Sequence, residues 1–252
     1  MRLLTLARDL KRRRARERQQ LFVCEGVRAV EELLRSSLVI RGALVTPHLH
    51  EVPRGAELVR ALRERGIEVA EVGPHEFASA ADTDSPQGVL AIAEIPSLTL
   101  DRVPVGNRFR LLILDGVQDP GNVGTLLRTA AALGADATAA LPGTVDLWNA
   151  KVVRSAMGAH FRHQAVSCGW DEVDAFCAAH DTPIWAADAA GSEIGTVAAP
   201  ERVALVLGNE GNGISDAARQ RAAQLVAVPI STAVESLNVA VAAGILLYEL
   251  RR

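Results

Sequence analysis

The fold is decided by the C-terminal stretch L-V-A-V-P-I-S-T-A-V-E-S-L-N-V-A-V-A-A-G-I-L-L-Y-E-L, residues 225–250. A short apolar run ending near Pro229 predicts a strand that leaves a sheet, and a polar loop follows over residues 231–235. Ser236 is placed to cap a helix that is apolar on nearly every side, and such a helix is normally buried. Chain ends usually lie on the surface. We therefore expect this tail to pack inside the fold or against a partner subunit.

Length and composition indicate a globular protein of one large or two ordinary domains. The chain has 252 residues, of which 49% are hydrophobic and 23% charged, so it can bury a sizeable core. No apolar run reaches the roughly 18 residues of a membrane span, and the basic N-terminus lacks the apolar core of a signal peptide. The chain has only three cysteines, an odd number, which does not suit a disulfide framework. These features predict a cytoplasmic protein with reduced thiols and no membrane contact.

The charge is distributed unevenly along the chain. Residues 1–20 carry a net charge of +6, whereas the whole chain carries −3, which leaves −9 for the remainder. This basic arm, with Arg12, Arg13 and Arg14 at its centre, is typical of a segment that contacts nucleic-acid phosphates. An ordinary solvated helix face explains this charge run as well as a nucleic-acid-binding arm does.

Two series of alternating strands and helices predict two α/β domains. The first series occupies residues 1–95, starting with a helix over residues 2–20. Residues 96–107 contain Pro96, Pro104 and Gly106 without apolar periodicity, and they predict a linker. The second series occupies residues 108–252 and predicts a parallel sheet covered by helices on both faces. In such a sheet ligands bind beyond the carboxyl ends of the strands, so the loops after the strands are the places to search.

Three of these loops carry polar and glycine-rich sequences. The first is D-G-V-Q-D-P-G-N-V-G-T-L-L-R-T-A, residues 115–130, in which Asn122 has the position of a helix N-cap and Arg128 lies on the following helix. The second is L-G-N-E-G-N-G, residues 207–213, where glycines permit a close backbone approach to a ligand. The third is the loop of the tail, with Ser236 and Asn238. Taken singly, each loop is also typical of plain helix capping or a strand-to-helix turn.

Taken together and in this order, the three loops resemble the three motifs of the SpoU (TrmH) branch of the SPOUT RNA methyltransferases. The first matches as D-P-x-N-x-G-x-x-x-R-T-A, the second as L-x-x-G-x-E-G-x-G, and the third as V-P-I followed by S-L-N-V-A-V-A. The resemblance covers residues 108–252. The N-terminal region, with F-V-C-E-G-V-R-A-V-E-E-L-L, resembles the substrate-binding domain that often precedes the catalytic domain. The third motif carries Thr232-Ala233 where many relatives have glycine, which affects the path of that loop.

The resemblance implies an S-adenosyl-L-methionine-dependent enzyme that methylates a ribose 2′-hydroxyl and leaves S-adenosyl-L-homocysteine. It implies a small N-terminal RNA-binding α/β domain and a catalytic α/β domain whose C-terminal chain forms a deep trefoil knot, in a homodimer joined through that domain. By the same resemblance the expected catalytic residues are Asn122, Arg128, Glu210, Ser236 and Asn238. The expected cofactor-binding residues are Leu207, Gly208, Val228, Ile230 and Leu237, and the expected RNA-binding residues are Arg12, Arg13, Arg14 and Arg128. No metal site is expected.

The sequence is also compatible with other functions. The fused N-terminal domain favours 23S ribosomal RNA as the substrate over tRNA, by analogy only. A non-catalytic RNA-binding or ribosome-assembly factor with the same fold is the alternative to an enzyme, although the intact polar motifs count against it. A nucleotide-binding dehydrogenase is disfavoured because the dinucleotide fingerprint G-x-G-x-x-G is absent, and the absence of a P-loop sequence likewise gives no support to a nucleoside triphosphate ligand.

Overall fold

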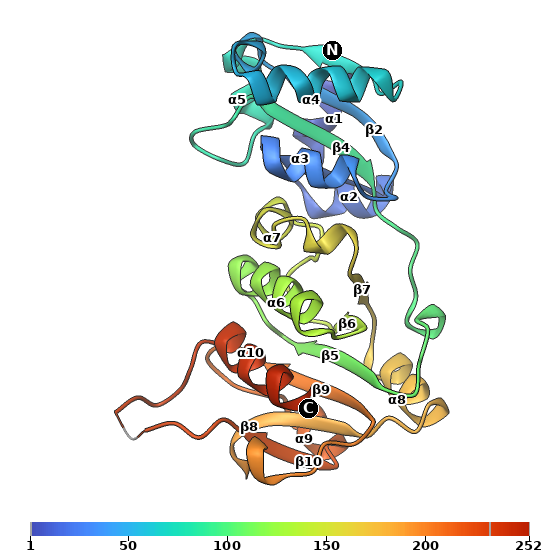
Figure 1. Cartoon of the computed structure of the whole chain (residues 1–252), viewed down its shortest axis with the longest axis vertical. Helices are drawn as coiled ribbons and strands as arrows, with labels where there is room; N and C mark the ends of the chain where they lie inside the picture. The colour runs from blue at the N-terminus through green and yellow to red at the C-terminus, as the bar shows by residue number, and fades with distance from the viewer. Residues whose placement is uncertain (1, 232, 252) are drawn as a thin grey trace. The chain divides into compact units, whose positions relative to one another are not determined.

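The computed structural model describes residues 2–231 and 233–251, and these form two compact units (Figure 1). The first unit consists of the chain up to Ser97 together with Trp148–Arg162, and the second of Leu98–Leu147 together with the chain from His163 onward. The segment 148–162 therefore packs in the first unit, although in sequence it lies between two strands of the second. Thr232, in the third motif, lies outside the described residues.

The first unit is built on a four-stranded mixed sheet. Its strands are β1 (Leu21–Glu25), β2 (Ile40–Val45), β3 (Val69–Glu71) and β4 (Val89–Glu94), in the order β1-β4-β2-β3. β4 runs antiparallel to β1 and β2, whereas β3 is parallel to β2. The helices are α1 (Arg2–Asp9), α2 (Arg13–Gln19), α3 (Val27–Leu34), α4 (Pro53–Glu64), α5 (Pro74–Ala80) and α7 (Ala150–Ser155), with short 3-10 turns at Pro47–Glu51 and Ala159–Phe161. The carboxyl ends of β1, β2 and β3 meet at one edge of this sheet.

The basic N-terminal segment is part of the core of this unit. It forms two helices where the sequence pattern predicted one, and Leu3, Leu4, Ala7 and Leu10 are buried with Phe77 of α5. The Arg16 side chain is also buried, and its Nη1 donates hydrogen bonds to the carbonyl oxygens of Leu10 (2.8 Å) and Lys11 (3.0 Å). Burial of these apolar side chains explains why the segment does not extend as a free arm.

An aromatic cluster holds segment 148–162 in the first unit. The rings of Phe22 and Trp148 lie 4.5 Å apart between centroids, and Phe22 also stacks with Phe161 at 6.0 Å. Outside the cluster, Arg162 Nη1 donates to Glu32 Oε2 at 2.8 Å. Aromatic pairs at such separations add to the energy of burial.

The second unit is built on a six-stranded sheet in which every pair of neighbours is parallel, as the alternating pattern predicted. Its order is β10-β8-β9-β5-β6-β7, from β5 (Phe109–Asp115), β6 (Ala137–Ala140), β7 (Gln164–Ser167), β8 (Ile184–Glu193), β9 (Arg202–Gly208) and β10 (Gln224–Ala227). The helices are α6 (Pro120–Leu133), α8 (Trp170–Ala179), α9 (Asp216–Arg221) and α10 (Val239–Leu250), with 3-10 turns at Leu100–Arg102 and Ile194–Thr196. The sheet is doubly wound, because the chain turns back between β7 and β8 to add strands on the other side of β5.

Helices cover both faces of this sheet. Val173 and Phe176 of α8 and Ala218 of α9 join one core with alternate residues of the strands, among them Leu111 and Ile113. α6 and α10 pack against each other, and α10 also contacts β9. Arg110 precedes Leu111 in β5, so its side chain lies on the opposite face of the sheet, and its guanidinium reaches α10. Its Nε and Nη2 donate to the carbonyl oxygen of Leu250 at 2.9 and 2.7 Å.

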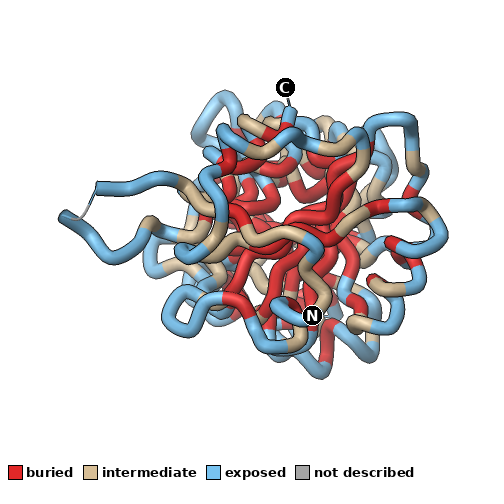
Figure 2. Tube along the Cα trace, turned by 90° about the horizontal axis from the view of Figure 1, so that it is seen from below, coloured by how far each residue is buried: buried red, intermediate tan, exposed pale blue. Residues whose placement is uncertain are grey.

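The tail differs in two details from what its sequence predicted. α10 begins at Val239 and is capped by Asn238, whose Oδ1 accepts from the amides of Ala240 (2.9 Å) and Val241 (3.4 Å), so the prediction of a Ser236 cap was wrong. The helix is buried on one side only. Its other side is exposed, as is most of the loop between β10 and α10, drawn in pale blue at the edge of Figure 2.

The described residues contain no helix of the length and apolar character that would cross a membrane.

Candidate active site

A cavity of about 640 Å³ lies at the carboxyl ends of the central strands of the second unit. It is bordered by β8 and by the segments that follow β5, β9 and β10, which include the three motifs singled out in the sequence. β5 and β9 are neighbours on either side of the point where the strand order reverses, and ligands of doubly wound sheets bind at such a point. The topology therefore brings together loops that lie about 90 to 115 residues apart in the chain.

The first loop presents Asn122 to this cavity because another residue caps the helix. α6 begins at Pro120, and Asp119 Oδ1 accepts a hydrogen bond from the Asn122 amide at 2.8 Å. Pro120 fits the first helical position, where a missing amide hydrogen is no loss. The interpretation of Asn122 as the N-cap was wrong by one turn, and the Asn122 side chain is free for other contacts.

A chain of hydrogen bonds joins one side chain from each motif. Asn122 Nδ2 donates to Glu210 Oε1 at 3.0 Å, and Asn122 Oδ1 accepts from Asn238 Nδ2 at 2.9 Å. Asn238 Oδ1 is in turn held by the first amides of α10. Because each amide has one partner that only donates and one that only accepts, the orientation of all three side chains is fixed by the network.

Glu210 is held as a carboxylate. Burial raises its pKa, but hydrogen bonds from Asn122 and from backbone amides, including those of Gln118 and Asp119, outweigh burial and bring the pKa below its usual value. The two backbone contacts measure 3.2 Å from Gln118 N and 3.1 Å from Asp119 N. A carboxylate with a lowered pKa is a weak base, so Glu210 is suited to orient Asn122 and the first loop.

The second loop depends on two residues of different kinds. A Cβ atom on Gly208 would lie 2.1 Å from the carbonyl carbon of Gly213, so only glycine fits where the backbone folds back on itself. Asn209 Nδ2 donates to the Gly116 carbonyl at 2.9 Å, and its Oδ1 accepts from the Gly211 amide at 2.9 Å. Sequence alone does not show this role of Asn209, because its bond to Gly116 joins two loops that are distant in sequence.

The structure brings together most of the residues expected at the site. All five expected cofactor residues border the cavity, as do four of the five expected catalytic residues: Leu207, Gly208, Val228, Ile230, Leu237, Asn122, Glu210, Ser236 and Asn238. Arg128 does not border it. It is exposed on α6, six residues after Asn122 and therefore about 9 Å further along the helix axis. Arg12, Arg13 and Arg14 are exposed on the first unit.

The cavity has the composition of a site for a nucleoside-like ligand. Leu207, Val226, Val228, Leu237 and Leu246 supply apolar walls, while the glycines of the second loop leave backbone amides and carbonyls accessible. The described part of the chain contains no group of three His, Cys, Asp or Glu side chains placed to hold a metal ion.

Comparison with known proteins agrees with this geometry. Residues 110–248 match the model of the SpoU rRNA Methylase family, and residues 5–91 match the MRM3-like substrate binding domain. The chain is 34% identical to the 23S rRNA (guanosine(2553)-2′-O)-methyltransferase RlmP of Bacillus subtilis, over 97% of this chain and 94% of the relative. It is 32% identical to a 23S rRNA (uridine(2479)-2′-O)-methyltransferase of Streptomyces viridochromogenes, over 94% and 84% of the two chains.

Solved structures give the same result. The SpoU methyltransferase AviRb of Streptomyces viridochromogenes in complex with AdoMet superposes with a TM-score of 0.89 at 28% identity, covering 99% of this chain and 96% of that one. An AdoMet-bound rRNA methyltransferase from Sinorhizobium meliloti gives 0.87 at 27% identity, with coverage of 99% and 94%. The convergence of three motif loops at one cavity, the two family models and these relatives together establish that the chain belongs to the SpoU rRNA methylase family.

Proposed function

We propose that this protein transfers a methyl group from S-adenosyl-L-methionine to a ribose 2′-hydroxyl of 23S ribosomal RNA. The observation that carries the proposal is the hydrogen-bonded chain Glu210–Asn122–Asn238 at the rim of an apolar, glycine-lined cavity. The enzymatic function is favoured over a purely binding role because this network fixes the orientation of polar side chains from all three motifs at the rim of one cavity. The named relatives act on 23S rRNA, which favours that substrate over tRNA.

The apolar walls and the second loop are suited to hold the cofactor. Leu207, Val228 and Leu237 would enclose the adenine ring, with Gly208 and Ile230 supplying backbone groups at its edge. When bound, S-adenosyl-L-methionine supplies a methyl group already activated on sulfur, and the product is S-adenosyl-L-homocysteine. The protein therefore has to position the ribose more than it has to activate the donor, and positioning alone is worth up to ~7–11 kcal/mol in well-oriented reactions.

The motif side chains serve this positioning. Asn122 and Asn238 present amide groups at the rim of the cavity, where they are placed to hydrogen-bond the ribose hydroxyls, and Ser236 adds a hydroxyl beside them. Glu210 fixes the first loop through three bonds and remains ionised. We assign no proton abstraction to Glu210, because its lowered pKa makes it a poor base.

Arg128 acts on the RNA phosphate in this proposal. A guanidinium is protonated at any physiological pH, so it neutralises charge and orients a phosphate more readily than it accepts a proton. Its exposed position on α6, away from the cavity walls, leaves it accessible to an RNA strand that lies across the site. With Arg128 on the phosphate, the negative charge that develops on the 2′-oxygen is stabilised while the hydroxyl proton passes to solvent water.

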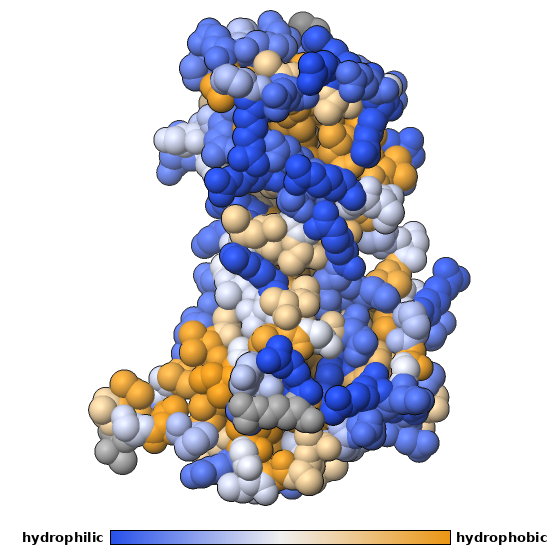
Figure 3. Space-filling view, in the orientation of Figure 1, coloured by the Kyte–Doolittle hydropathy of each residue, from blue (hydrophilic) through white to orange (hydrophobic). Residues whose placement is uncertain are grey.

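A homodimer joined through α10 accounts for the exposed apolar side of that helix. Val241 is 52% exposed, Ile245 37% and Tyr248 41%, and their spacing places them on one stripe. Figure 3 shows apolar surface gathered over α10 and the loop before it. The buried side of the same helix would close the trefoil knot expected of this family. Ile245→Glu is then expected to give a monomer in sedimentation equilibrium, and an unaltered dimer would contradict this interface.

The first unit binds the RNA in this proposal. Arg12, Arg13 and Arg14 lie exposed near the start of α2, where they can contact phosphates, although Arg13 also pairs with Glu17 at 2.7 Å. The buried cysteines Cys24, Cys168 and Cys177 are free thiols, which is consistent with a reducing cytoplasmic environment, where rRNA is also found.

The decisive experiment is methylation of total RNA with labelled cofactor, followed by mapping of the modified nucleotide. We expect one 2′-O-methylated position in 23S rRNA. Arg128→Ala is expected to abolish methylation while calorimetry still detects cofactor binding. Turnover near that of the unaltered protein would refute the assigned role of Arg128, and absence of cofactor binding at millimolar concentration would refute the enzymatic proposal.

A further inference from the structure

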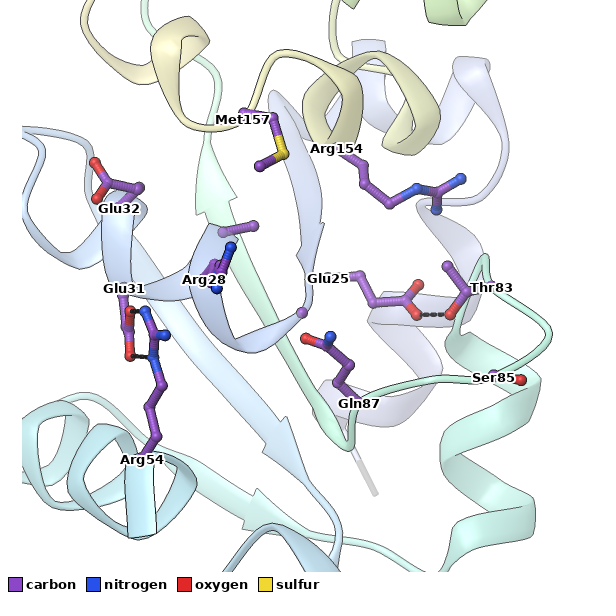
Figure 4. Close-up of a pocket in the computed structure, with 12 residues that line it drawn as sticks. Glu25, Arg28, Glu31, Glu32, Arg54, Thr83, Ser85, Gln87, Arg154 and Met157 are labelled. Atoms are coloured by element: carbon purple, nitrogen blue, oxygen red, sulfur yellow. Dashed lines mark hydrogen bonds and ion pairs between the residues drawn. The ribbon is translucent and has the colours of Figure 1, made fainter. Parts of the chain in front are cut away.

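A second cavity, of about 440 Å³, lies wholly within the first unit, far in sequence from the motif loops. Figure 4 shows it between the start of α3, the loop of residues 83–87 and the segment that carries α7. It is bordered at the carboxyl end of β1 by Glu25 and Gly26, and its volume is within the ~300–1,000 Å³ of small-molecule pockets. Nothing in the methyl transfer described above uses it.

The acidic side chains around this cavity are all engaged. Glu31 accepts from Arg54 Nε at 2.7 Å and also from Arg54 Nη2, as the paired dashes in Figure 4 show. Glu32 pairs with Arg35 and Arg162, both at 2.8 Å. The buried Glu25 carboxylate accepts from the Asp82 amide at 2.7 Å and from the Thr83 hydroxyl.

Arg28 differs from the other charged groups at the cavity. Over residues 2–231 and 233–251 its guanidinium has no hydrogen bond and no ion pair, and it is exposed at the cavity wall. It also occupies the first turn of α3, where a positive charge opposes the helix dipole and no acidic residue offsets it. A cation that costs the helix stability and has no partner in the fold is available to bind an anion from outside.

Met157 provides an independent observation on the opposite side. Its φ is 51°, in the left-handed region that non-glycine residues rarely adopt, and the residue is 54% exposed. Figure 4 shows that side chain extending from the segment after α7 toward the space that Arg28 borders. Strained backbone and an exposed, flexible thioether are both typical of binding surfaces.

We propose that this cavity binds an unpaired nucleotide of the RNA substrate, with its base against Met157 and an adjoining phosphate on Arg28. The inference rests on the proposed function, because it assumes that RNA is the substrate. RNA-binding proteins recognise unpaired nucleotides by packing the base on a side-chain surface and by hydrogen bonds to its edges. Ser85 and Gln87 border the cavity and supply polar groups for such contacts.

A neighbouring cavity favours a nucleic-acid strand over a free anion. It measures about 510 Å³ and shares Arg28, Arg54 and Gln87 with the first. Arg28 thus stands between two hollows, where a phosphate that links two successive nucleotides would lie. A free anion would fill neither cavity.

The test compares Arg28→Gln with Arg60→Gln in the full-length protein. Arg60 is an exposed arginine of α4 in the same unit, borders neither cavity and has only a 3.8 Å ion pair with Glu64. Binding of a 23S rRNA transcript would be measured by filter retention across a salt series. We expect Arg28→Gln to weaken binding about five- to tenfold and to reduce the slope of log K against log salt by about 1, as loss of one phosphate contact does. Arg60→Gln is expected to change neither quantity.

Met157→Gly separates binding from folding. Glycine relieves the positive φ, so the melting temperature is expected to stay the same or to rise, while affinity for the transcript falls at least threefold. A blunt RNA duplex of equal length is expected to show no difference between these variants and the unaltered protein.

Two outcomes would overturn the proposal. One is an Arg28→Gln variant that behaves like Arg60→Gln in both affinity and salt slope. The other is an equal loss of binding to the duplex, which would indicate a nonspecific phosphate contact. If the unaltered protein binds no RNA, the proposed function fails first, whereas if it binds and methylates RNA while Arg28→Gln matches the control, only this site fails.

Discussion

Replacing Asn122 by aspartate would set two carboxylates against each other at the centre of the motif network. Asn122 Nδ2 lies 3.0 Å from Glu210 Oε1, so the new oxygen of Asn122→Asp would occupy nearly the same distance. Two unit charges at that distance repel by about 6 kcal/mol at an effective dielectric constant of 20 and by about 1 kcal/mol in water. Because both positions are partly solvated, we expect this repulsion to lower the free energy of unfolding by ~2–4 kcal/mol. Loss of the hydrogen bond lowers it by a further ~1 kcal/mol.

The pair is expected to relieve this repulsion by sharing a proton. The apparent pKa of the carboxyl pair in the folded state then lies above that of the unfolded chain, and the folded protein binds more protons. Stability of Asn122→Asp is therefore greatest at low pH and is lost as pH rises through the raised pKa. The methylation rate of Asn122→Asp is expected to fall at least a hundredfold at pH 8, because the side chain at position 122 no longer has a fixed orientation.

The assays are thermal melts at pH 5 and pH 8 and methylation of a 23S rRNA transcript at pH 8. Asn107→Asp is the matched control, since it adds the same charge at an exposed position of the second unit that does not border the cavity of the three motif loops. Methylation by Asn122→Asp at the rate of the unaltered protein would refute the reasoning. So would a pH dependence of the melting temperature identical to that of Asn107→Asp.

Three further substitutions test other parts of the second unit. Arg110→Met removes the donors that hold the Leu250 carbonyl and is expected to lower the free energy of unfolding by about 3 kcal/mol in urea titrations, whereas a loss below 0.5 kcal/mol would contradict that anchor. Burial lowers the pKa of His163 to about 4, so the unfolded state binds a proton that the folded state excludes, and stability should decrease by up to about 3 kcal/mol as pH falls from 6.5 to 4. In urea titrations at pH 7 and 4.5, His163→Gln should reduce the change in the free energy of unfolding between the two pH values. An unchanged difference would show that other groups cause the pH dependence. Gly208→Ala is expected to abolish cofactor binding in calorimetry, because its Cβ would overlap Gly213, and retained binding would show that the loop can shift.

The local structure of the second unit follows closely from its sequence. Apolar runs such as Val203–Leu207 read as buried strands, and Gly134 ends α6 in the left-handed conformation, as glycine does after a helix. The positions of the motif loops at strand ends also follow from this alternation. Prediction was less accurate where two polar residues competed for one cap, as with Asp119 and Asn122 or Ser236 and Asn238, because the choice depends on what each side chain contacts across the fold.

The first unit shows a different limit. The charge run of residues 1–20 is equally compatible with a free arm and with two packed helices. The structure distinguishes the two, because Leu3, Leu4 and Leu10 are buried in one core with Phe77 and residues of the sheet. Likewise nothing local to residues 148–162 indicates that Trp148 and Phe161 pack on Phe22. Aromatic side chains bury against any apolar surface, so their partner is fixed by the three-dimensional path of the chain.

Strand periodicity, the residues that end helices and motif spacing are local properties, and they were enough to predict the α/β class, the parallel sheet, the family and nine of the residues that border the cavity of the motif loops. Which of those residues contact one another depends on the path of the chain in three dimensions. Asn122, Glu210 and Asn238 are separated by 88 and 116 residues in their two hydrogen bonds, and Arg28 acquires its significance only because every acid around it is paired. The tail that decides the fold shows the same division. Its apolar composition predicted burial, but α6 packs against only one side of α10, and Val241, Ile245 and Tyr248 on the other side are exposed.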